Sequence, residues 1–177
     1  MIERSVGLIV MADMPGLGLV AVLRERGYWN FEKMKPESYP GACQVTAHGK
    51  LEQGEEFIDA LNRELGEELG DDFALRFWSV LDGSKKAIRS GRLIDIYREE
   101  DAERVVVTFG TKLLCAYLKE VCLAPESGAL RLVRPEEVFG IVDVRSFDKA
   151  TGIQDRKIIA MFPDEKEAVA AAFARFS

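Results

Sequence analysis

The segment from Gly49 to Gly70 constrains this chain most, because it combines the spacing of a buried helix with a dense group of acidic side chains. Apolar residues recur every four positions in it, at Phe57, Leu61, Leu65 and Leu69, with Ile58 beside them. In a helix these side chains form one stripe that packs against a core. The spacing therefore predicts a helix over residues 55–69 with one buried face.

The acidic residues of this segment lie close together. Residues 51–72 carry nine acids and only Arg63 as a positive charge, a net charge of -8, whereas the whole chain has -6. At roughly 100° per residue, Glu64, Glu67 and Glu68 fall on one arc beside the apolar stripe. Like charges at these spacings repel and weaken a helix. We therefore expect a bound cation to relieve the repulsion.

Mg²⁺ or Mn²⁺ is the expected cofactor. Both ions prefer oxygen ligands, keep several waters and bind substrate phosphates. The single histidine, His48, and the three scattered cysteines lack the spacing of a zinc site. We therefore expect the carboxylates of this helix to meet in one pocket and bind the ion there.

The segment resembles the Nudix box of the Nudix hydrolase family. The pattern is G-x5-E-x7-R-E-U-x-E-E-x-G, with U apolar, and its residues here are Gly49, Glu55, Arg63, Glu64, Leu65, Glu67, Glu68 and Gly70. One position differs, because the family usually has an aliphatic residue where this chain has Asp71, and this affects the expected helix end more than the metal site. The resemblance implies an α+β fold, a Nudix-type α/β/α sandwich with a mixed sheet, as a single domain over residues 1–177.

The resemblance also implies an activity: a metal-dependent hydrolase that cleaves the diphosphate linkage of a nucleoside diphosphate derivative or a nucleoside triphosphate. The implied catalytic residues are Glu55, Arg63, Glu64, Glu67 and Glu68, and the implied metal ligands are the Gly49 carbonyl, Glu64, Glu67 and Glu68. Arg63 would hold Glu55 rather than touch the substrate. Glu64 is the first candidate for the general base. Glu126, in a turn-like loop where some relatives have an additional metal-binding glutamate, is the second candidate base and a further metal ligand.

Two other functions stay open. The first is a catalytically inactive Nudix-fold module that senses a nucleotide, although a pure binder has no need for crowded like charges. The second is an enzyme similar to isopentenyl-diphosphate isomerases, which residues 39–49 resemble. Those isomerases usually lose part of the Arg-Glu-x-x-Glu-Glu set, whereas this chain keeps all of it, so hydrolysis is favoured.

Composition indicates which binding partners and which cellular location to expect. A chain of 177 residues with 47% apolar content can bury one good core. It has no apolar run long enough for a membrane span and no signal-peptide pattern, so we expect a cytoplasmic protein that binds no membrane. A pI near 5.0 argues against nucleic acid as a partner, which leaves a small-molecule diphosphate or nucleotide. The oligomeric state stays open, with a homodimer among the possibilities.

Local patterns predict the remaining elements. Strands are expected at residues 5–11, 17–23, 44–47, 74–81, 104–118 and 129–133, with a bulge at Gly110 in the fifth. A short helix is expected at residues 135–139 and an amphipathic helix at residues 164–176. Residues 27–41 form an expected aromatic and basic loop, and residues 84–103 a charged connection that ends in an acidic loop. Strands and helices in this order fit a layered α+β domain.

Overall fold

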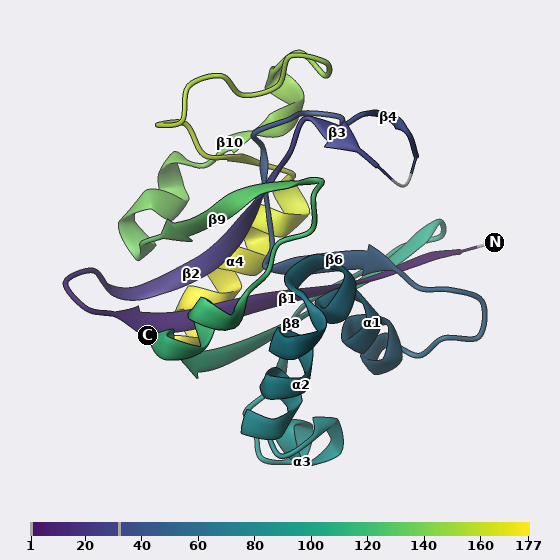
Figure 1. Cartoon of the computed structure of the whole chain (residues 1–177), viewed down its shortest axis with the longest axis vertical. Coiled ribbons are helices and arrows are strands. Elements are labelled where there is room, and N and C mark those ends of the chain that lie inside the picture. The colour runs from purple at the N-terminus through teal and green to yellow at the C-terminus, as the bar shows by residue number, and fades with distance from the viewer. Residues whose placement is uncertain (1, 32) are drawn as a thin grey trace.

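The computed structural model describes residues 2–31 and 33–177, and these form a mixed seven-stranded sheet with helices on both faces (Figure 1). Its strands are β1 (Glu3–Met14), β2 (Gly18–Arg26), β5 (Cys43–Gln44), β6 (Ala47–Lys50), β7 (Ile94–Glu100), β8 (Arg104–Leu114) and β9 (Ser127–Val133). Along the main path the order is β5-β2-β1-β8-β7, with β6 beside β1 and β9 beside β2. The pair β1–β8 is parallel and the other pairs of this sheet are antiparallel.

Helices and short elements complete the fold. The helices are α1 (Phe57–Leu69), α2 (Asp71–Val80), α3 (Ser84–Arg89) and α4 (Pro163–Phe176), with 3-10 helices at Cys115–Glu120, Pro135–Gly140 and Val144–Ser146. Two small sheets pair β3 (Trp29–Asn30) with β4 (Lys35–Pro36) and β10 (Val142–Asp143) with β11 (Ala160–Met161). Figure 1 shows α1 and α2 on one side of the large sheet and α4 on the other.

Strand β1 separates two cores. Val6, Leu8 and Val10 pack with α1 and α2, whereas Ile9 and Met11 pack with α4. Successive side chains of a strand point to opposite faces, so this alternation buries both faces of β1. The expected α/β/α sandwich with a mixed sheet is confirmed.

The box helix α1 forms as predicted, although it begins at Phe57 rather than at residue 55. It ends at Gly70, whose φ of 94° is a conformation that favours glycine. Asp71 then starts α2 and places a carboxylate in the first helical turn, where the helix dipole stabilises negative charge. The position that departs from the family pattern is thus the start of a second helix.

Two predicted strands are wrong in type or length. Residues 74–81 lie mostly in α2, where Phe73 and Phe77 are buried one helical turn apart. The strand predicted over residues 104–118 stops at Leu114, because its parallel partner β1 gives its last pairing there, Asp13 with Leu114. A 3-10 helix follows at Cys115–Glu120.

Several boundaries also differ. The segment 44–47 is divided between β5 and β6, the loop 27–41 contains β3 and β4, and the connection 84–103 contains α3 and β7. The bulge lies in β7, between Asp95 and Tyr97, rather than at Gly110. Gly110 instead gives space to its neighbours, since a Cβ there would lie 2.9 Å from side-chain carbons of Ile96 and Phe176. The other predicted strands and helices are present with shifted ends.

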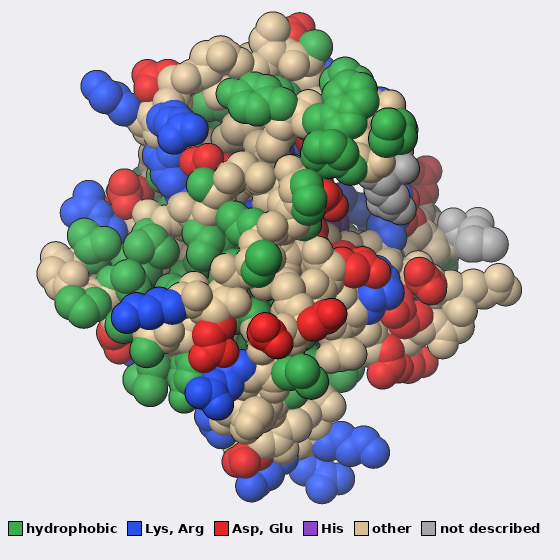
Figure 2. All heavy atoms as spheres, viewed as in Figure 1, with side chains coloured by type: hydrophobic (Ala, Val, Ile, Leu, Met, Phe, Trp, Pro, Cys, Tyr) green, Lys and Arg blue, Asp and Glu red, His purple; other side chains and the backbone are tan. Residues whose placement is uncertain are grey.

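Two surface properties complete the description. Within residues 2–31 and 33–177, no helix has the length and apolarity needed to cross a membrane. Apolar side chains gather on the surface over the β3–β4 hairpin, at the upper right of Figure 2, where Tyr28, Phe31 and Met34 are exposed. This apolar patch stands beside the cavity that contains the box carboxylates, because Asn30 and Lys33 of the same hairpin line that cavity.

Candidate active site

A cavity of about 670 Å³ is lined by β2, β6, α1 and the start of α4. Strand β1 pairs with β6 over Ser5–Leu8 and with β2 from Val10 onward, so β6 and β2 lie beside successive parts of β1 and separate from each other there. Thr46 lies where the two strands separate. Its hydroxyl accepts a hydrogen bond from Val10 N at 2.8 Å and donates one to the Val22 carbonyl. This topology brings side chains of distant segments to one cavity.

Gly49 and Glu64 meet in this cavity. Glu64 is buried on α1, and Gly49 on β6 passes so close that a Cβ at position 49 would lie 1.7 Å from Glu64 Oε1. Only glycine leaves room for the carboxylate. Burial raises the pKa of Glu64.

Arg63 holds three carboxylates. Its Nε and Nη2 each donate to Glu55 at 3.1 Å, and its Nη1 donates to Glu64 at 2.7 Å and to Glu67 at 3.0 Å. The paired guanidinium holds the pKa of Glu55 below its ordinary value. The expected pair of Arg63 with Glu55 is therefore present, with Glu55 outside the cavity lining. Arg63 also contacts two predicted metal ligands, which the sequence analysis did not anticipate.

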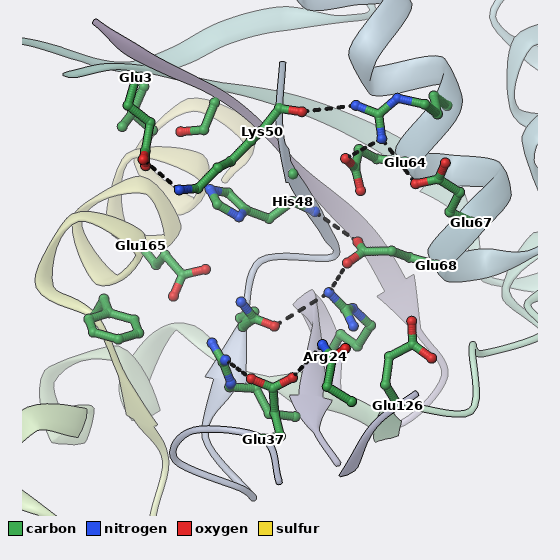
Figure 3. Close-up of a pocket in the computed structure, with 18 of the residues that line it drawn as sticks. Glu3, Arg24, Glu37, His48, Lys50, Glu64, Glu67, Glu68, Glu126 and Glu165 are labelled. Carbon is green, nitrogen blue, oxygen red and sulfur yellow. Dashed lines mark hydrogen bonds and ion pairs between the residues drawn. The ribbon is translucent and has the colours of Figure 1, made fainter. Parts of the chain in front are cut away.

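Glu68 is paired with Arg24, a residue that the sequence analysis missed. The Arg24 guanidinium contacts Glu68 Oε1, and the backbone N–H of His48 donates to Glu68 Oε2 at 2.9 Å (Figure 3). Burial raises the pKa of Glu68 to about 7 although Arg24 opposes the shift. Arg24 itself is 4% exposed. A charged residue that continues the apolar run of β2 was the available signal for it.

Glu126 lies at the same cavity. It is half-buried just before β9, and Figure 3 shows it beside Arg24. Its negative charge contributes to the raised pKa of Glu68. Four of the predicted acids, Glu64, Glu67, Glu68 and Glu126, thus line one cavity together with Gly49.

These oxygen donors suit a hard divalent ion, but they are held by arginines. Among residues 2–31 and 33–177, no three acidic, histidine or cysteine side chains are grouped closely enough to hold a metal ion. Glu68 is turned to Arg24, while Glu64 and Glu67 share Arg63. The residues that could hold Mg²⁺ or Mn²⁺ are Glu64, Glu67, Glu68 and the Gly49 carbonyl, once the carboxylates leave their arginine partners.

The opposite wall of the cavity was not predicted. Glu37 accepts hydrogen bonds from Arg26 and, at 3.0 Å, from Asn30, and these bonds keep its pKa below the ordinary value although burial opposes them. Burial lowers the pKa of His48 to about 4, so its imidazole is neutral. Glu165, from α4, completes this wall (Figure 3). Glu37 and Glu165 come from segments without any shared motif, so spacing could not reveal them, whereas His48 directly precedes Gly49 of the box.

No protein-family model matches the sequence, and no curated protein matches it. Solved structures do. A MutT/nudix family protein from Enterococcus faecalis aligns with a TM-score of 0.59 at 13% identity, over 99% of this chain and 62% of that chain. A mutT/nudix family protein from Listeria innocua gives 0.57 at 18% identity, over 98% and 92%. The NUDIX domain of Shewanella oneidensis NrtR, in complex with ADP ribose, gives 0.55 at 12% identity, over 100% and 90%.

The chain therefore has the Nudix fold. Identities of 12 to 18% establish this shared architecture and leave the reaction to be inferred from the site itself.

Proposed function

We propose that this protein is a metal-dependent Nudix pyrophosphohydrolase that cleaves the diphosphate linkage of a nucleoside diphosphate derivative or a nucleoside triphosphate. The observation that carries the proposal is the common cavity of Glu64, Glu67, Glu68 and Glu126, which also contains Gly49 and Arg24. Structural neighbours with mutT/nudix names and an ADP-ribose complex support a nucleotide-derived substrate.

The charges of the cavity suit a diphosphate only when a cation is present. Bound Mg²⁺ or Mn²⁺ supplies a water of lowered pKa and neutralises phosphate oxygens. Glu64, Glu67, Glu68 and the Gly49 carbonyl are the proposed ligands. With Glu68 as a ligand of the ion, the Arg24 guanidinium would be free to donate hydrogen bonds to a phosphate, whose geometry arginine matches.

Two carboxylates are candidates to accept the proton of the attacking water. Glu64 is the first, because burial already raises its pKa and so increases its affinity for a proton. Glu126 is the second, because it lines the cavity from the loop before β9. Arg63 has a positioning role, since it orders Glu55, Glu64 and Glu67 at once.

The test is hydrolysis with a matched variant. The protein is incubated with Mg²⁺ or Mn²⁺ and a panel of ADP-ribose, dinucleoside polyphosphates and nucleoside triphosphates, while phosphate, pyrophosphate and monophosphate release are measured. We expect at least one substrate to be cleaved, EDTA to stop cleavage, and Glu68→Gln to lower the rate more than about 100-fold. Glu56→Gln is the control, because Glu56 is exposed outside the cavity lining.

The second candidate is a nucleotide-binding module that cleaves nothing. The observation that favours it is that every box carboxylate in the cavity already has an arginine partner. An intact substrate panel, together with thermal stabilisation by a nucleotide, would contradict the hydrolase and support this module.

A further inference from the structure

Three buried polar atoms around the cavity have no hydrogen-bond partner. In the part of the chain that the structure describes they are Arg24 Nε, Arg26 Nε and Glu165 Oε2, and all three residues line the cavity. An unpartnered buried polar group destabilises the folded state, and native proteins keep few of them. Because all three lie at one cavity, their position indicates that a bound ligand supplies the missing hydrogen-bond partners.

Glu165 is the most informative of the three. It is 8% exposed near the start of α4, and its Oε1 accepts a hydrogen bond from Val45 N at 3.3 Å. In a capping box a glutamate at this helical position reaches back to its own helix start, whereas Glu165 reaches the segment between β5 and β6. This structural contact uses one oxygen only. Figure 3 shows the carboxyl group directed into the cavity.

The pKa of Glu165 agrees with a shortage of donors. Burial, with the neighbouring charge of Asp164, raises the pKa to about 8, although the Val45 N–H, Arg26 and Arg24 oppose the shift. Each additional N–H donor stabilises an ionised carboxylate and lowers its pKa. A ligand with such a donor would therefore lower the pKa of Glu165 and leave its free oxygen ionised as an acceptor.

The surroundings of Glu165 suit a ring. Phe162 also lines the cavity, and Tyr39 packs against its ring with centroids 6.0 Å apart in an edge arrangement. A flat, partly apolar group beside Phe162 would bring its edge to Glu165. The cavity volume of about 670 Å³ lies in the range of small-molecule sites. One wall thus offers a ring and an acceptor, and the α1 wall offers carboxylates and arginines.

We propose that Glu165 recognises a nucleobase: its free oxygen accepts a hydrogen bond from an N–H or amino group on the edge of a base that lies beside Phe162. The inference rests on the proposed function for the position of the phosphates, at the carboxylates of α1. It specifies a substrate whose base carries an N–H donor. A diphosphate linked to an isoprenoid group lacks such a donor.

The test is binding without turnover, by calorimetry in the presence of Mg²⁺. The probes are AMP, GMP, CMP and UMP, with two controls: ribose 5-phosphate, which has no base, and purine riboside 5′-monophosphate, whose base edge has no N–H donor. We expect at least one of the four nucleotides to bind the wild type about tenfold or more tightly than both controls. Equal affinity for all six probes would overturn the proposal, whatever any variant does.

Glu165→Gln is the matched variant. It keeps the side-chain length and an oxygen for Val45 N, and it turns an N–H₂ group toward the cavity in place of the acceptor. We expect the preferred nucleotide to lose about tenfold or more in affinity while ribose 5-phosphate changes less than about twofold. Glu167→Gln, an exposed acid of α4 outside the cavity lining, should change neither. An unchanged preference in Glu165→Gln would contradict the proposal.

The outcome separates this inference from the hydrolase. A wild type that cleaves diphosphates without any preference among the probes overturns base recognition alone. A wild type that loses its base preference on Glu165→Gln but cleaves no substrate supports base recognition and contradicts the hydrolase.

Discussion

Single residues differ in how well the sequence predicts their partners. Arg63 and Glu55 belong to one motif and make the expected contact, whereas Arg24 comes from β2, 44 residues before its partner Glu68. Helical spacing predicts which charges share one face of a helix. It does not predict which charged residues of a neighbouring strand contact that face. The expectation that a bound cation relieves the crowded acids is therefore incomplete, because Arg24 and Arg63 already provide opposite charge.

Gly49→Ala should affect the site more than the fold. The added methyl group would occupy the position of the Glu64 carboxylate, and this flexible side chain can swing aside. We expect the free energy of unfolding to fall by less than about 1.5 kcal/mol and turnover to fall about 100-fold. Urea unfolding and steady-state rates measure the two effects. Gly140→Ala is the control, because no atom lies within 4 Å of a Cβ placed there; equal turnover in both variants would contradict the role of Gly49.

Arg24 and Glu68 should be energetically coupled. The Arg24 side chain is buried and that of Glu68 is half-buried, at 5% and 15% exposure, so removing one partner leaves a poorly compensated charge. In a double-mutant cycle with Arg24→Met and Glu68→Gln, we expect a coupling energy of about 1–3 kcal/mol. Urea unfolding at about pH 8 measures it, above the pKa of about 7 for Glu68. Strictly additive effects would show that the ion pair contributes nothing.

At the scale of elements, long periodic segments were predicted well and short apolar runs were not. The strand predicted over residues 74–81 is wrong in type, because a short apolar run fits a strand and a buried helix equally. The four-residue spacing of Phe73, Phe77 and Leu81 was the signal for α2, and all three are buried. The division of β5 from β6 depends on the hydroxyl of Thr46, a tertiary contact that no local pattern contains.

The stability of the folded protein should depend on pH through Glu165 of α4. Its pKa is raised from 4.5 to about 8 on folding, so the folded state binds more protons than the unfolded state between these values. The wild type therefore loses stability as pH rises through this window. Glu165→Gln lacks this titration. As pH rises, the free energy of unfolding of the variant minus that of the wild type should therefore increase, by up to about 1.4 kcal/mol per pH unit.

Urea unfolding of both proteins at about pH 5, 6.5 and 8 measures this difference. Glu167→Gln serves as the control, since Glu167 is exposed on the same helix. Parallel stability profiles for the wild type and Glu165→Gln would show that the raised pKa of Glu165 is wrong.

At the scale of the whole molecule, the sequence predicted the acidic half of the cavity and not the other half. The box residues are close in sequence, so their spacing determines one helix face. Arg24 and Glu165 reach the cavity only because β2 and β6 pair with successive parts of β1 and α4 covers the opposite face of the sheet. That arrangement is a property of the sheet topology, which the structure reveals and the pattern of residues does not.

Metal binding should stabilise the whole protein by exchanging arginine partners for an ion. A ligand at 100 times its Kd adds about 2.7 kcal/mol, which for a chain of this size raises Tm by about 5–10 °C. We expect Mn²⁺ and Mg²⁺ to produce this shift and EDTA to reverse it, as followed by thermal unfolding. Glu67→Gln should lose most of the shift, whereas Glu56→Gln, exposed at the start of the same helix, should keep it.

This measurement distinguishes the two functions without any substrate. Arg24 and Arg63 compete with the ion for the same carboxylates, so the size of the shift reports which partner these side chains prefer. A Tm that stays constant at millimolar Mn²⁺ would show that the carboxylates keep their arginine partners and do not bind the ion. The box would then be a closed ion-pair network, and the cavity would bind a nucleotide without the means to cleave it.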